Sequence, residues 1–449
     1  MEFLGADPGR KAILYFLAAI LLGAFVLSLP LSHGARPVGV IDALFTATSA
    51  VCVTGLTVVD TGTAFSPFGQ VVILVLIQLG GLGIMTFATL LIAAAGAQVA
   101  FRDRLGVAGS LAAGTFMRTK SLLQAVIGVT LTIELIGALV LFLLFSGSLP
   151  LGQAAWHAVF HSVSAFCNAG FSTFSANLEA CADRPAILLT VAALIILGGL
   201  GFAVITELLH RASGQSRRLS LHTRICLSAT AVLLVGGTLA VFFAEYGNTL
   251  AGFSPAGKAV NAFFQAVVCR TAGFNSVSQA RLTEVAVLVS MVLMFIGACP
   301  GSTAGGIKTT TITVIVTTAW DRFRGRRTPS IFHRRIGEES IIRAVGVFIL
   351  AVFVVAAMLA LLAVLWDRPP LRAGSVHGWL AENLFEVVSA FGTVGLSLGI
   401  TPELNMPGKI VIILTMFIGR VGLLTLAFGL ARPTATGEIV YVEEPIAIG

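Results

Sequence analysis

Four short stretches decide the fold: VTGLT at 53–57, NAGFS at 168–172, TAGFN at 271–275 and TVGLS at 393–397. Each has a glycine at its centre, which is followed by a bulky apolar residue and then by a small polar one. These glycines are Gly55, Gly170, Gly273 and Gly395. Each stretch follows an apolar run too short to span a membrane, at 38–52, 153–166, 256–268 and 376–391. Runs of this length between longer apolar segments predict re-entrant helices.

Apolar residues dominate the rest of the chain. Charged residues make up 11% of the 449 positions and hydrophobic residues 57%, whereas soluble domains have about 25% and about 45–50%. Lipid must therefore cover much of the outside, since the chain cannot build a charged surface. Segments able to cross ~30 Å of hydrocarbon lie near 12–30, 69–97, 121–146, 185–209, 223–245, 285–319, 340–365 and 407–431. The sequence predicts an all-α integral membrane protein with eight transmembrane helices.

The distribution of positive charge predicts the orientation. With Arg10 and Lys11 inside, eighteen of the 28 Lys and Arg residues lie on the cytoplasmic side and eight lie outside, while Lys308 and Arg420 fall within spans. Cytoplasmic loops carry such an excess of basic residues, so both termini are predicted to be cytoplasmic. The net charge of +7 therefore reflects membrane orientation and predicts no nucleic-acid partner.

The unit of span, short helix, glycine turn and span occurs four times. The predicted repeats are 1–97, 98–210, 211–320 and 321–431, followed by a cytoplasmic tail at 432–449. The register continues 24 to 28 residues after each central glycine, at Gly80, Gly198, Gly297 and Gly419. A repeat of about 110 residues in one membrane chain predicts pseudo-symmetry about a central pore.

The glycine stretches predict a cation filter. Non-helical backbone at membrane depth is tolerated only where it is buried in protein or lines a cavity. Four such segments on one axis would replace the water shell of a cation with carbonyl oxygens, and glycine permits the close approach. The predicted ion-binding residues are Val53, Thr54, Gly55, Asn168, Ala169, Gly170, Thr271, Ala272, Gly273, Thr393, Val394 and Gly395. No cofactor and no metal beyond the permeating ion are predicted.

At these residues the sequence resembles the Trk/Ktr/HKT superfamily of potassium transporters, and looks most like its KtrB-type subunits. The most specific pieces are SAVCVTGLTVVD (49–60), IQLGGLGIMTF (77–87), HSVSAFCNAGFS (161–172), RTAGFNS (270–276), PGSTAGGIKTTT (300–311) and SAFGTVGLS (389–397). The resemblance implies potassium uptake across a bacterial plasma membrane. It also implies that the tail supports a homodimer and contacts a cytosolic, nucleotide-binding ring of the KtrA type.

The stretch GACPGSTAGGIKTTT at 297–311 must interrupt its helix. Pro300 removes a hydrogen bond, and the glycines lower helix propensity. The resemblance implies that 297–309 is an intramembrane loop that blocks the pore and moves aside. We therefore expect gate residues at Gly297, Pro300, Gly301, Ser302, Thr303, Gly305, Gly306, Lys308 and, from the fourth repeat, Arg420. Arg420 either sets a barrier or latches the loop, or it bonds structurally to carbonyls of the broken helix; Lys308 either serves the gate or only reaches toward the cytoplasm.

Two classes of transport protein fit this pattern. Only one of the four second spans is expected to be broken, which favours a channel-like protein over a coupled secondary transporter with discontinuous helices in related halves. A membrane enzyme is disfavoured, because no nucleophile–base pair or metal cluster lies at one depth.

Several other polar residues are candidates for a functional role. Outer acidic residues such as Asp60 and Glu179 could form a cation-attracting vestibule, and Arg270 is expected to brace the third glycine stretch. His157 and His161 have helical metal spacing but lack a third ligand. Glu134 lies within a span, where it either couples protons or makes an interhelical hydrogen bond.

Overall fold

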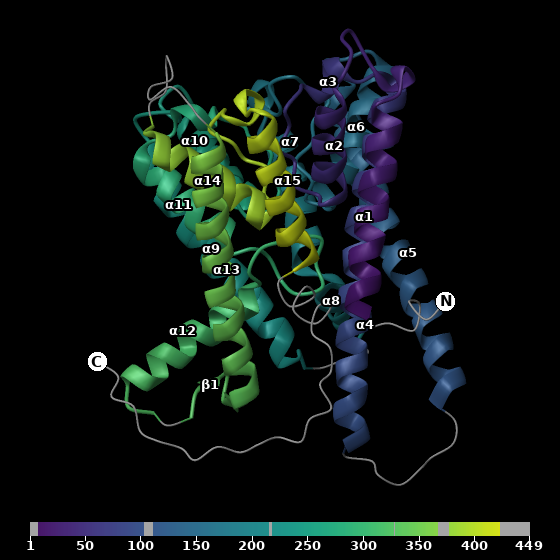
Figure 1. Ribbon diagram of the computed structural model, residues 1–449. Helices are drawn as coiled ribbons and strands as arrows, with labels where there is room; N and C mark the ends of the chain where they lie inside the picture. The colour runs from purple at the N-terminus through teal and green to yellow at the C-terminus, as the bar shows by residue number, and fades with distance from the viewer. Residues whose placement is uncertain (1–7, 103–110, 215–217, 327, 367–376, 423–449) are drawn as a thin grey trace.

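The computed structural model describes residues 8–102, 111–214, 218–326, 328–366 and 377–422. This part of the chain is almost entirely helical (Figure 1). Five of its helices are long and apolar enough to cross a membrane: α1 (Pro8–Leu27), α4 (Pro67–Arg102), α5 (Leu111–Phe145), α9 (Leu221–Glu245) and α13 (Glu338–Leu365). Large apolar side chains on their outer faces, such as Leu22, Phe243 and Phe353, are exposed. Lipid is the solvent that suits these faces.

Four short helices lie where the sequence predicted re-entrant segments. They are α2 (Val40–Val51), α6 (Leu151–Phe166), α10 (Pro255–Val268) and α14 (Trp379–Gly392), and they gather in the upper half of the molecule in Figure 1. Each begins at the surface and ends in the core; in α2, Val40 is 76% exposed and Val51 is fully buried. Each also contributes a fully buried phenylalanine, namely Phe45, Phe160, Phe264 and Phe385.

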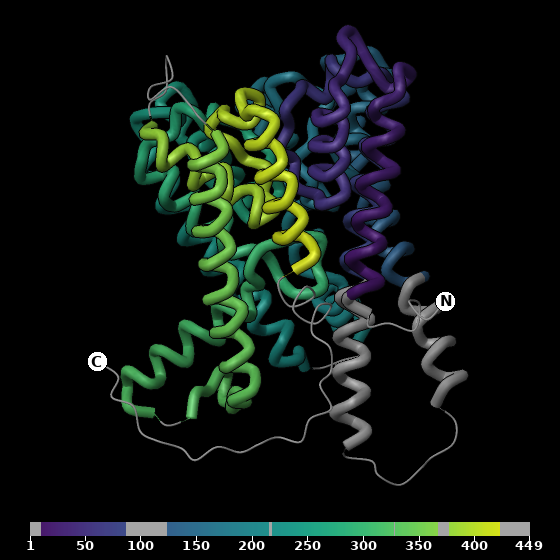
Figure 2. The backbone as a smooth tube through the Cα atoms, in the orientation of Figure 1, coloured from purple at the N-terminus to yellow at the C-terminus, as the bar shows by residue number. Residues whose placement is uncertain are grey.

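Helix contacts close a ring in chain order. The helix after each short helix packs against the next short helix: α4 on α6, α7 (Pro185–Leu200) on α10, α11 (Glu284–Phe295) on α14, and α15 (Met406–Val421) on α2. The last contact brings the yellow end of the described chain beside its purple beginning (Figure 2). The structure describes the span expected at 407–431 only as far as residue 422. The predicted tail at 432–449 lies outside the described residues.

The span expected at 185–209 is broken, and its prediction as one continuous helix was wrong. α7 ends at Leu200, and α8 (Phe202–Ala212) leaves it at an angle of 102°. Gly201 makes the bend with a φ of +85°, and a Cβ there would lie 2.7 Å from the Pro300 carbonyl oxygen. The expectation that only one second span is broken therefore fails, because a second helix bends where the 297–309 region passes.

The break in the third repeat was correctly anticipated. α11 ends at Phe295 and α12 (Thr309–Phe323) follows a non-helical segment at 296–308, one residue earlier at each end than predicted. Ile296 and Ile307 form an isolated parallel bridge, so the two ends of this segment lie together. We call residues 296–308 the intramembrane segment.

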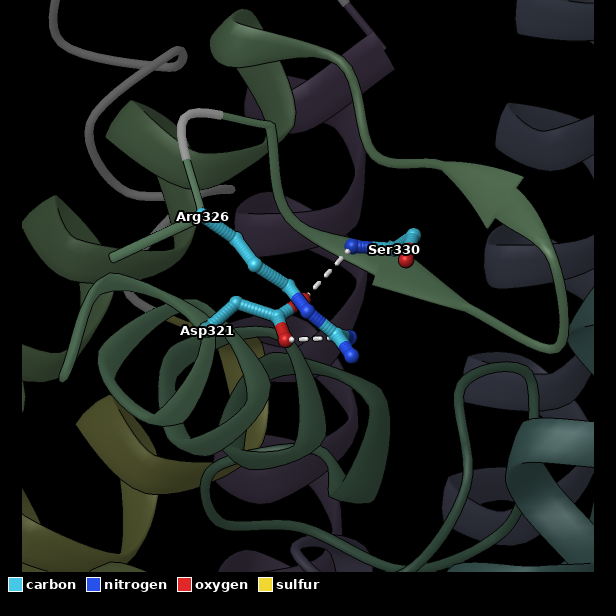
Figure 3. A network of polar contacts seen from close by, with 3 residues as sticks. All are labelled: Asp321, Arg326 and Ser330. Carbon is cyan, nitrogen blue, oxygen red and sulfur yellow. Dashed lines mark hydrogen bonds and ion pairs between the residues drawn. The ribbon is translucent and has the colours of Figure 1, made fainter. Parts of the chain in front are cut away.

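One hairpin departs from the all-α prediction. β1 (Ser330–Ile331) pairs antiparallel with β2 (Arg334–Arg335) through Phe332 and His333, whose φ values are +51° and +62°. Positive φ at both central residues is the signature of a type I′ hairpin turn. Asp321 of α12 anchors the hairpin, accepting a hydrogen bond from Ser330 N at 2.9 Å and pairing with Arg326 at 3.1 Å (Figure 3).

Short elements connect the helices. They are η2 (Pro30–Ser32), α3 (Thr61–Ala64), η3 (Glu179–Cys181), η4 (Gln279–Arg281) and η5 (Thr401–Glu403).

Candidate functional site

The four glycine stretches adopt one backbone conformation. Each short helix is followed by a left-handed residue that is not glycine, and two positions later by the central glycine, again at positive φ. The left-handed residues are Val53, Asn168, Thr271 and Thr393, with φ between +49° and +68°. This region is unfavourable for L-residues, above all for β-branched ones. Because it recurs at the same offset four times, the surrounding packing must impose it.

The central glycines form a closed ring. A Cβ built on any of them would lie closer than 3.0 Å to the carbonyl oxygen of the residue that precedes the next glycine. Gly55 meets Ala169 in this way, Gly170 meets Ala272, Gly273 meets Val394, and Gly395 returns to Thr54. Eight of the twelve predicted ion-binding residues therefore lie in one ring. The other four are the left-handed residues, which form the turns leading into it.

A cavity opens onto this ring. It has a volume of about 340 Å³ and is lined by all four central glycines. Of the outer acidic residues, Asp60 and Glu179 line it, together with hydroxyl and amide groups such as Ser172, Asn275 and Ser397. Burial raises the pKa of the Glu179 carboxyl, against a hydrogen bond from Asn275 that lowers it. The cavity thus presents oxygen atoms and two carboxyl groups to whatever approaches the ring.

The intramembrane segment is packed against the turns that lead into the ring. A Cβ on Gly305 would collide with the Thr393 hydroxyl, and the Thr303 hydroxyl donates to the Phe166 carbonyl at 3.2 Å. Backbone bonds join Cys299 N to Gly199 O (3.0 Å) and Phe202 N to Gly301 O (3.1 Å). The segment is therefore held by the turns of the second and fourth repeats and by the bend between α7 and α8.

Two basic residues clamp the same segment. Arg420, 2% exposed, donates to the Thr303 carbonyl and, at 3.0 Å, to the Gly80 carbonyl. Lys308 Nζ donates to the segment's own Ala304 carbonyl at 2.6 Å. The remaining predicted gate residues shape the turn: Gly301 and Gly306 have positive φ, Ser302 donates to the Cys299 carbonyl, Gly297 packs on Gly305, and Pro300 faces Gly201.

Comparisons with known proteins identify the family to which this chain belongs. A sequence profile of the TrkH family, described as cation transport protein, matches residues 12–435. The chain belongs to the TrkH family. It is similar to the Ktr system potassium uptake protein B of Bacillus subtilis, at 39% identity over 98% of this chain and 97% of that one. It is also similar to the potassium/sodium uptake protein NtpJ of Enterococcus hirae, at 37% identity over 97% and 95%.

The fold has a solved counterpart. The crystal structure of the potassium transporter TrkH from Vibrio parahaemolyticus matches with a TM-score of 0.76 and 21% identity, covering 95% of this chain and 85% of that one. Together with the long apolar helices, family membership identifies the chain as a multi-pass integral membrane protein.

Serines of the short helices hold the ring of this TrkH-family chain. The Ser49 and Ser389 hydroxyls accept hydrogen bonds from the N–H groups of Gly55 and Gly395, at 3.0 and 3.1 Å. The Ser164 hydroxyl donates to the Phe171 carbonyl at 2.8 Å. The third repeat has Val267 at this position. Its glycine stretch therefore lacks the serine brace that the other three have.

Two buried ionisable residues were missed as supports of the ring. His161 Nε2 lies 2.9 Å from the Ser172 hydroxyl, and Glu386 accepts a hydrogen bond from Ser397 at 2.7 Å. His161 Nδ1 lies 2.7 Å from the His157 carbonyl, which can only accept. Nδ1 must therefore carry the proton, and Nε2 accepts from Ser172. His161 and Glu386 each stand nine residues before the central glycine, a regularity that aligning the short helices would have revealed.

The downstream glycines permit close packing on the short helices. A Cβ on Gly80, Gly198 or Gly419 would overlap the carbonyl at the end of α2, α6 or α14, respectively. In the third repeat Gly297 instead meets Gly305 of the intramembrane segment. In the first, second and fourth repeats, the glycine of the common register allows a span to pack on the end of a short helix. In the third repeat, it allows close packing on the intramembrane segment.

The other polar residues singled out from the sequence are Glu134, the histidine pair and Arg270. Glu134 accepts a hydrogen bond from Gln78 at 3.0 Å across α4 and α5, the interhelical alternative considered from sequence. No group of three or more His, Cys, Asp or Glu side chains among the described residues has metal-binding geometry. Arg270 does not brace its own stretch through Nε or Nη2, which have no hydrogen-bond partner.

Proposed function

We propose that this chain carries potassium ions into a bacterial cell across the plasma membrane, through a filter made of backbone carbonyls. The observation that carries the proposal is the closed ring of Gly55, Gly170, Gly273 and Gly395 under one oxygen-lined cavity. Carbonyl oxygens preceding these glycines lie on the same ring, where they can replace the hydration shell of a cation. The potassium named for the B. subtilis and V. parahaemolyticus proteins agrees with this assignment.

The proposed architecture is four pseudo-symmetric repeats around the ring, with eight membrane crossings. The helix contacts in chain order support it, as does the backbone conformation shared by the four turns. The repeats are 1–97, 98–210, 211–320 and 321–431. The excess of basic residues on one side favours cytoplasmic termini, and the short helices would then direct their partly negative C-terminal ends at the ion.

The intramembrane segment is the proposed gate. It packs against the turns that lead into the ring, none of its residues lines the cavity, and Arg420 binds it to the α4 backbone. Moving the segment away from α4 requires breaking at least one of those two charge-assisted hydrogen bonds, each worth about 1.5–3 kcal/mol. Arg420 thus fits the role of a latch.

Regulation is proposed to come from outside the chain. The B. subtilis relative is named as protein B of a Ktr system, a name that implies a further component. We propose that this chain forms a homodimer and that a cytosolic nucleotide-binding ring of the KtrA type acts on the intramembrane segment.

A coupled secondary transporter is the second candidate. The break at Gly201 adds a second discontinuous helix to the one in the third repeat, and discontinuous helices are typical of alternating-access transporters. The E. hirae relative is named for both potassium and sodium. The alternative has a sodium-coupled and a proton-coupled form, and the name of the E. hirae relative bears on the sodium-coupled form.

Rubidium flux separates the two functions. The full chain is purified and reconstituted into liposomes, and rubidium uptake is measured with and without competing sodium. A carbonyl filter predicts uptake down the rubidium gradient that saturating potassium blocks. Rubidium accumulation above equilibrium, driven by an imposed sodium or proton gradient at zero membrane potential, would establish the coupled transporter instead. Uptake no greater than in empty liposomes would refute both.

A further inference from the structure

The polar residue two positions after the central glycine is held differently in the third repeat. In the second and fourth repeats this residue is Ser172 or Ser397, and its partner, His161 or Glu386, belongs to the short helix of the same repeat. The third repeat has Phe264 where those partners stand, nine residues before the glycine. A phenyl ring has no polar group to offer, so the third repeat needs a partner from elsewhere.

The turn into the third glycine stretch is also wound differently. In the other three repeats, the N–H of the residue before the central glycine donates to a serine carbonyl five residues back, at 2.7 or 2.8 Å. In the third repeat, Ala272 N donates to the Val268 carbonyl, four residues back, and Gly273 N reaches only the same carbonyl, at 3.4 Å. Within the described part of the chain, no side chain of α10 forms a hydrogen bond with the stretch at 271–275. The short helix of this repeat therefore holds its stretch through the backbone alone.

A loop of the second repeat makes contacts that replace the missing ones. We call residues 177–179 the crossing loop. Leu178 N donates to the Asn275 carbonyl at 3.1 Å, and Asn275 Nδ2 donates to Glu179 Oε1 at 2.7 Å. The same nitrogen lies 3.4 Å from the Val277 carbonyl, which can only accept, so the orientation of the Asn275 amide is fixed. Both the main chain and the side chain of Asn275 are thus held from the neighbouring repeat.

The crossing loop is itself anchored on both repeats. Asn177 has a φ of +52°, and its Nδ2 donates to the carbonyl of the ring glycine Gly170 at 3.3 Å. Just after the loop, Asn261 of α10 donates to the Ala182 carbonyl at 3.0 Å. The crossing loop therefore joins a ring glycine of the second repeat to the glycine stretch of the third.

We propose that Glu179 is a positioning residue for the third glycine stretch, and that through Asn275 it helps to set the ion preference of the ring. Its carboxyl oxygen does from the neighbouring repeat what Glu386 does within the fourth repeat. Asn275 stands two residues after Gly273, so a shift of Asn275 displaces the carbonyls that would replace the water shell of an ion. The effect on ion preference rests on the proposed function, whereas the contact between the two repeats does not.

Glu179 also lines the cavity, which gives it a simpler role to be distinguished from positioning. A carboxylate at the mouth of a pore raises the local concentration of every cation. Its loss would then lower the uptake of rubidium and sodium alike and leave the preference between them unchanged. Positioning depends instead on an oxygen that accepts from Asn275, with or without a charge.

Rubidium uptake into liposomes with competing sodium separates the two roles. Glu179→Ala removes the acceptor, so the sodium concentration that halves rubidium uptake should fall about fivefold, the factor that one ordinary hydrogen bond is worth. Glu179→Gln keeps an accepting oxygen and should stay near wild type. The matched control Asp183→Ala removes an exposed carboxylate a few residues further along and should also stay near wild type. A folded Glu179→Ala with the wild-type preference, or a Glu179→Gln that behaves like Glu179→Ala, would overturn the positioning role.

Asn275→Ser approaches the same contact from its other side. It introduces the residue that the second and fourth repeats have at this position, and its shorter side chain withdraws the amide from Glu179. It should reproduce the change in preference of Glu179→Ala, and the double variant should show no further change, because both substitutions remove one interaction. Additive effects in the double variant would overturn the proposal.

Hydrogen exchange followed by mass spectrometry tests the contact without any transport. Because Leu178 N–H is bonded to the Asn275 carbonyl, the peptide covering 177–179 should exchange several-fold faster in Asn275→Ser than in the wild type or Asp183→Ala. Equal exchange in the three proteins would overturn the contact. If liposomes with the wild type take up no rubidium, the proposed function fails, while the exchange result still decides whether the crossing loop holds the third stretch.

Discussion

Replacing Gly395 by serine should change the ion preference of the filter. Gly395 has a φ of +96°, and a Cβ there would lie 2.1 Å from the Thr54 carbonyl oxygen and 2.9 Å from the Gly55 Cα. Backbone strain of about 1–3 kcal/mol and overpacking of about 1–3 kcal/mol act together. The nearest relief is a displacement of the Thr54 carbonyl, which belongs to the ring. If about 1.4 kcal/mol of this strain falls on one ion more than another, the preference changes tenfold.

The assay is rubidium uptake into liposomes at increasing sodium concentration. Wild type and Gly395→Ser are compared at equal protein density, with thermal unfolding in detergent as a check of folding. Gly236→Ser is the matched control, because Gly236 is an exposed glycine of α9 whose added Cβ would meet nothing within 4 Å. It should leave the preference unchanged. A folded, conducting Gly395→Ser protein with the wild-type rubidium-to-sodium preference would refute the reasoning about the ring.

Three further substitutions test other parts of the site. Arg420→Gln removes the charged donor to Thr303 and Gly80 and should raise rubidium flux; unchanged flux would remove the latch. Glu386→Ala leaves the Ser397 hydroxyl without its acceptor at a cost of about 1–3 kcal/mol, so the melting temperature should fall and sodium should compete better with rubidium. Glu386→Gln should restore both the melting temperature and the preference for rubidium. Equal behaviour of the two variants would argue against the hydrogen bond. Gly201→Ala places a Cβ 2.7 Å from the Pro300 carbonyl oxygen at a φ of +85°. The variant should be less stable by about 1–3 kcal/mol and should unfold at a lower temperature. A melting temperature equal to that of Gly236→Ala would show that the bend tolerates a side chain.

The helices followed from local pattern, whereas the failed prediction of an unbroken span at Gly201 has a tertiary cause. Apolar runs placed the short helices α2, α6, α10 and α14 to within a few residues, because length and hydrophobicity are properties of a single segment. The bend at Gly201 was missed, since LGGLG at 197–201 reads as glycines inside one helix. Only the intramembrane segment, passing beside Gly201, distinguishes a bend from a packing contact.

The sequence by itself determined that this chain lies in a membrane, that it carries four glycine stretches in register, and that its helix breaks near Pro300. These conclusions depend on composition, periodicity and backbone propensity, which each segment has before it folds. Tertiary structure alone decided that the stretches close a ring in chain order, and that His161 and Glu386 stand behind it. The ring contacts join residues far apart in the chain, and His161 and Glu386 meet their serines only once each glycine stretch folds back along its short helix.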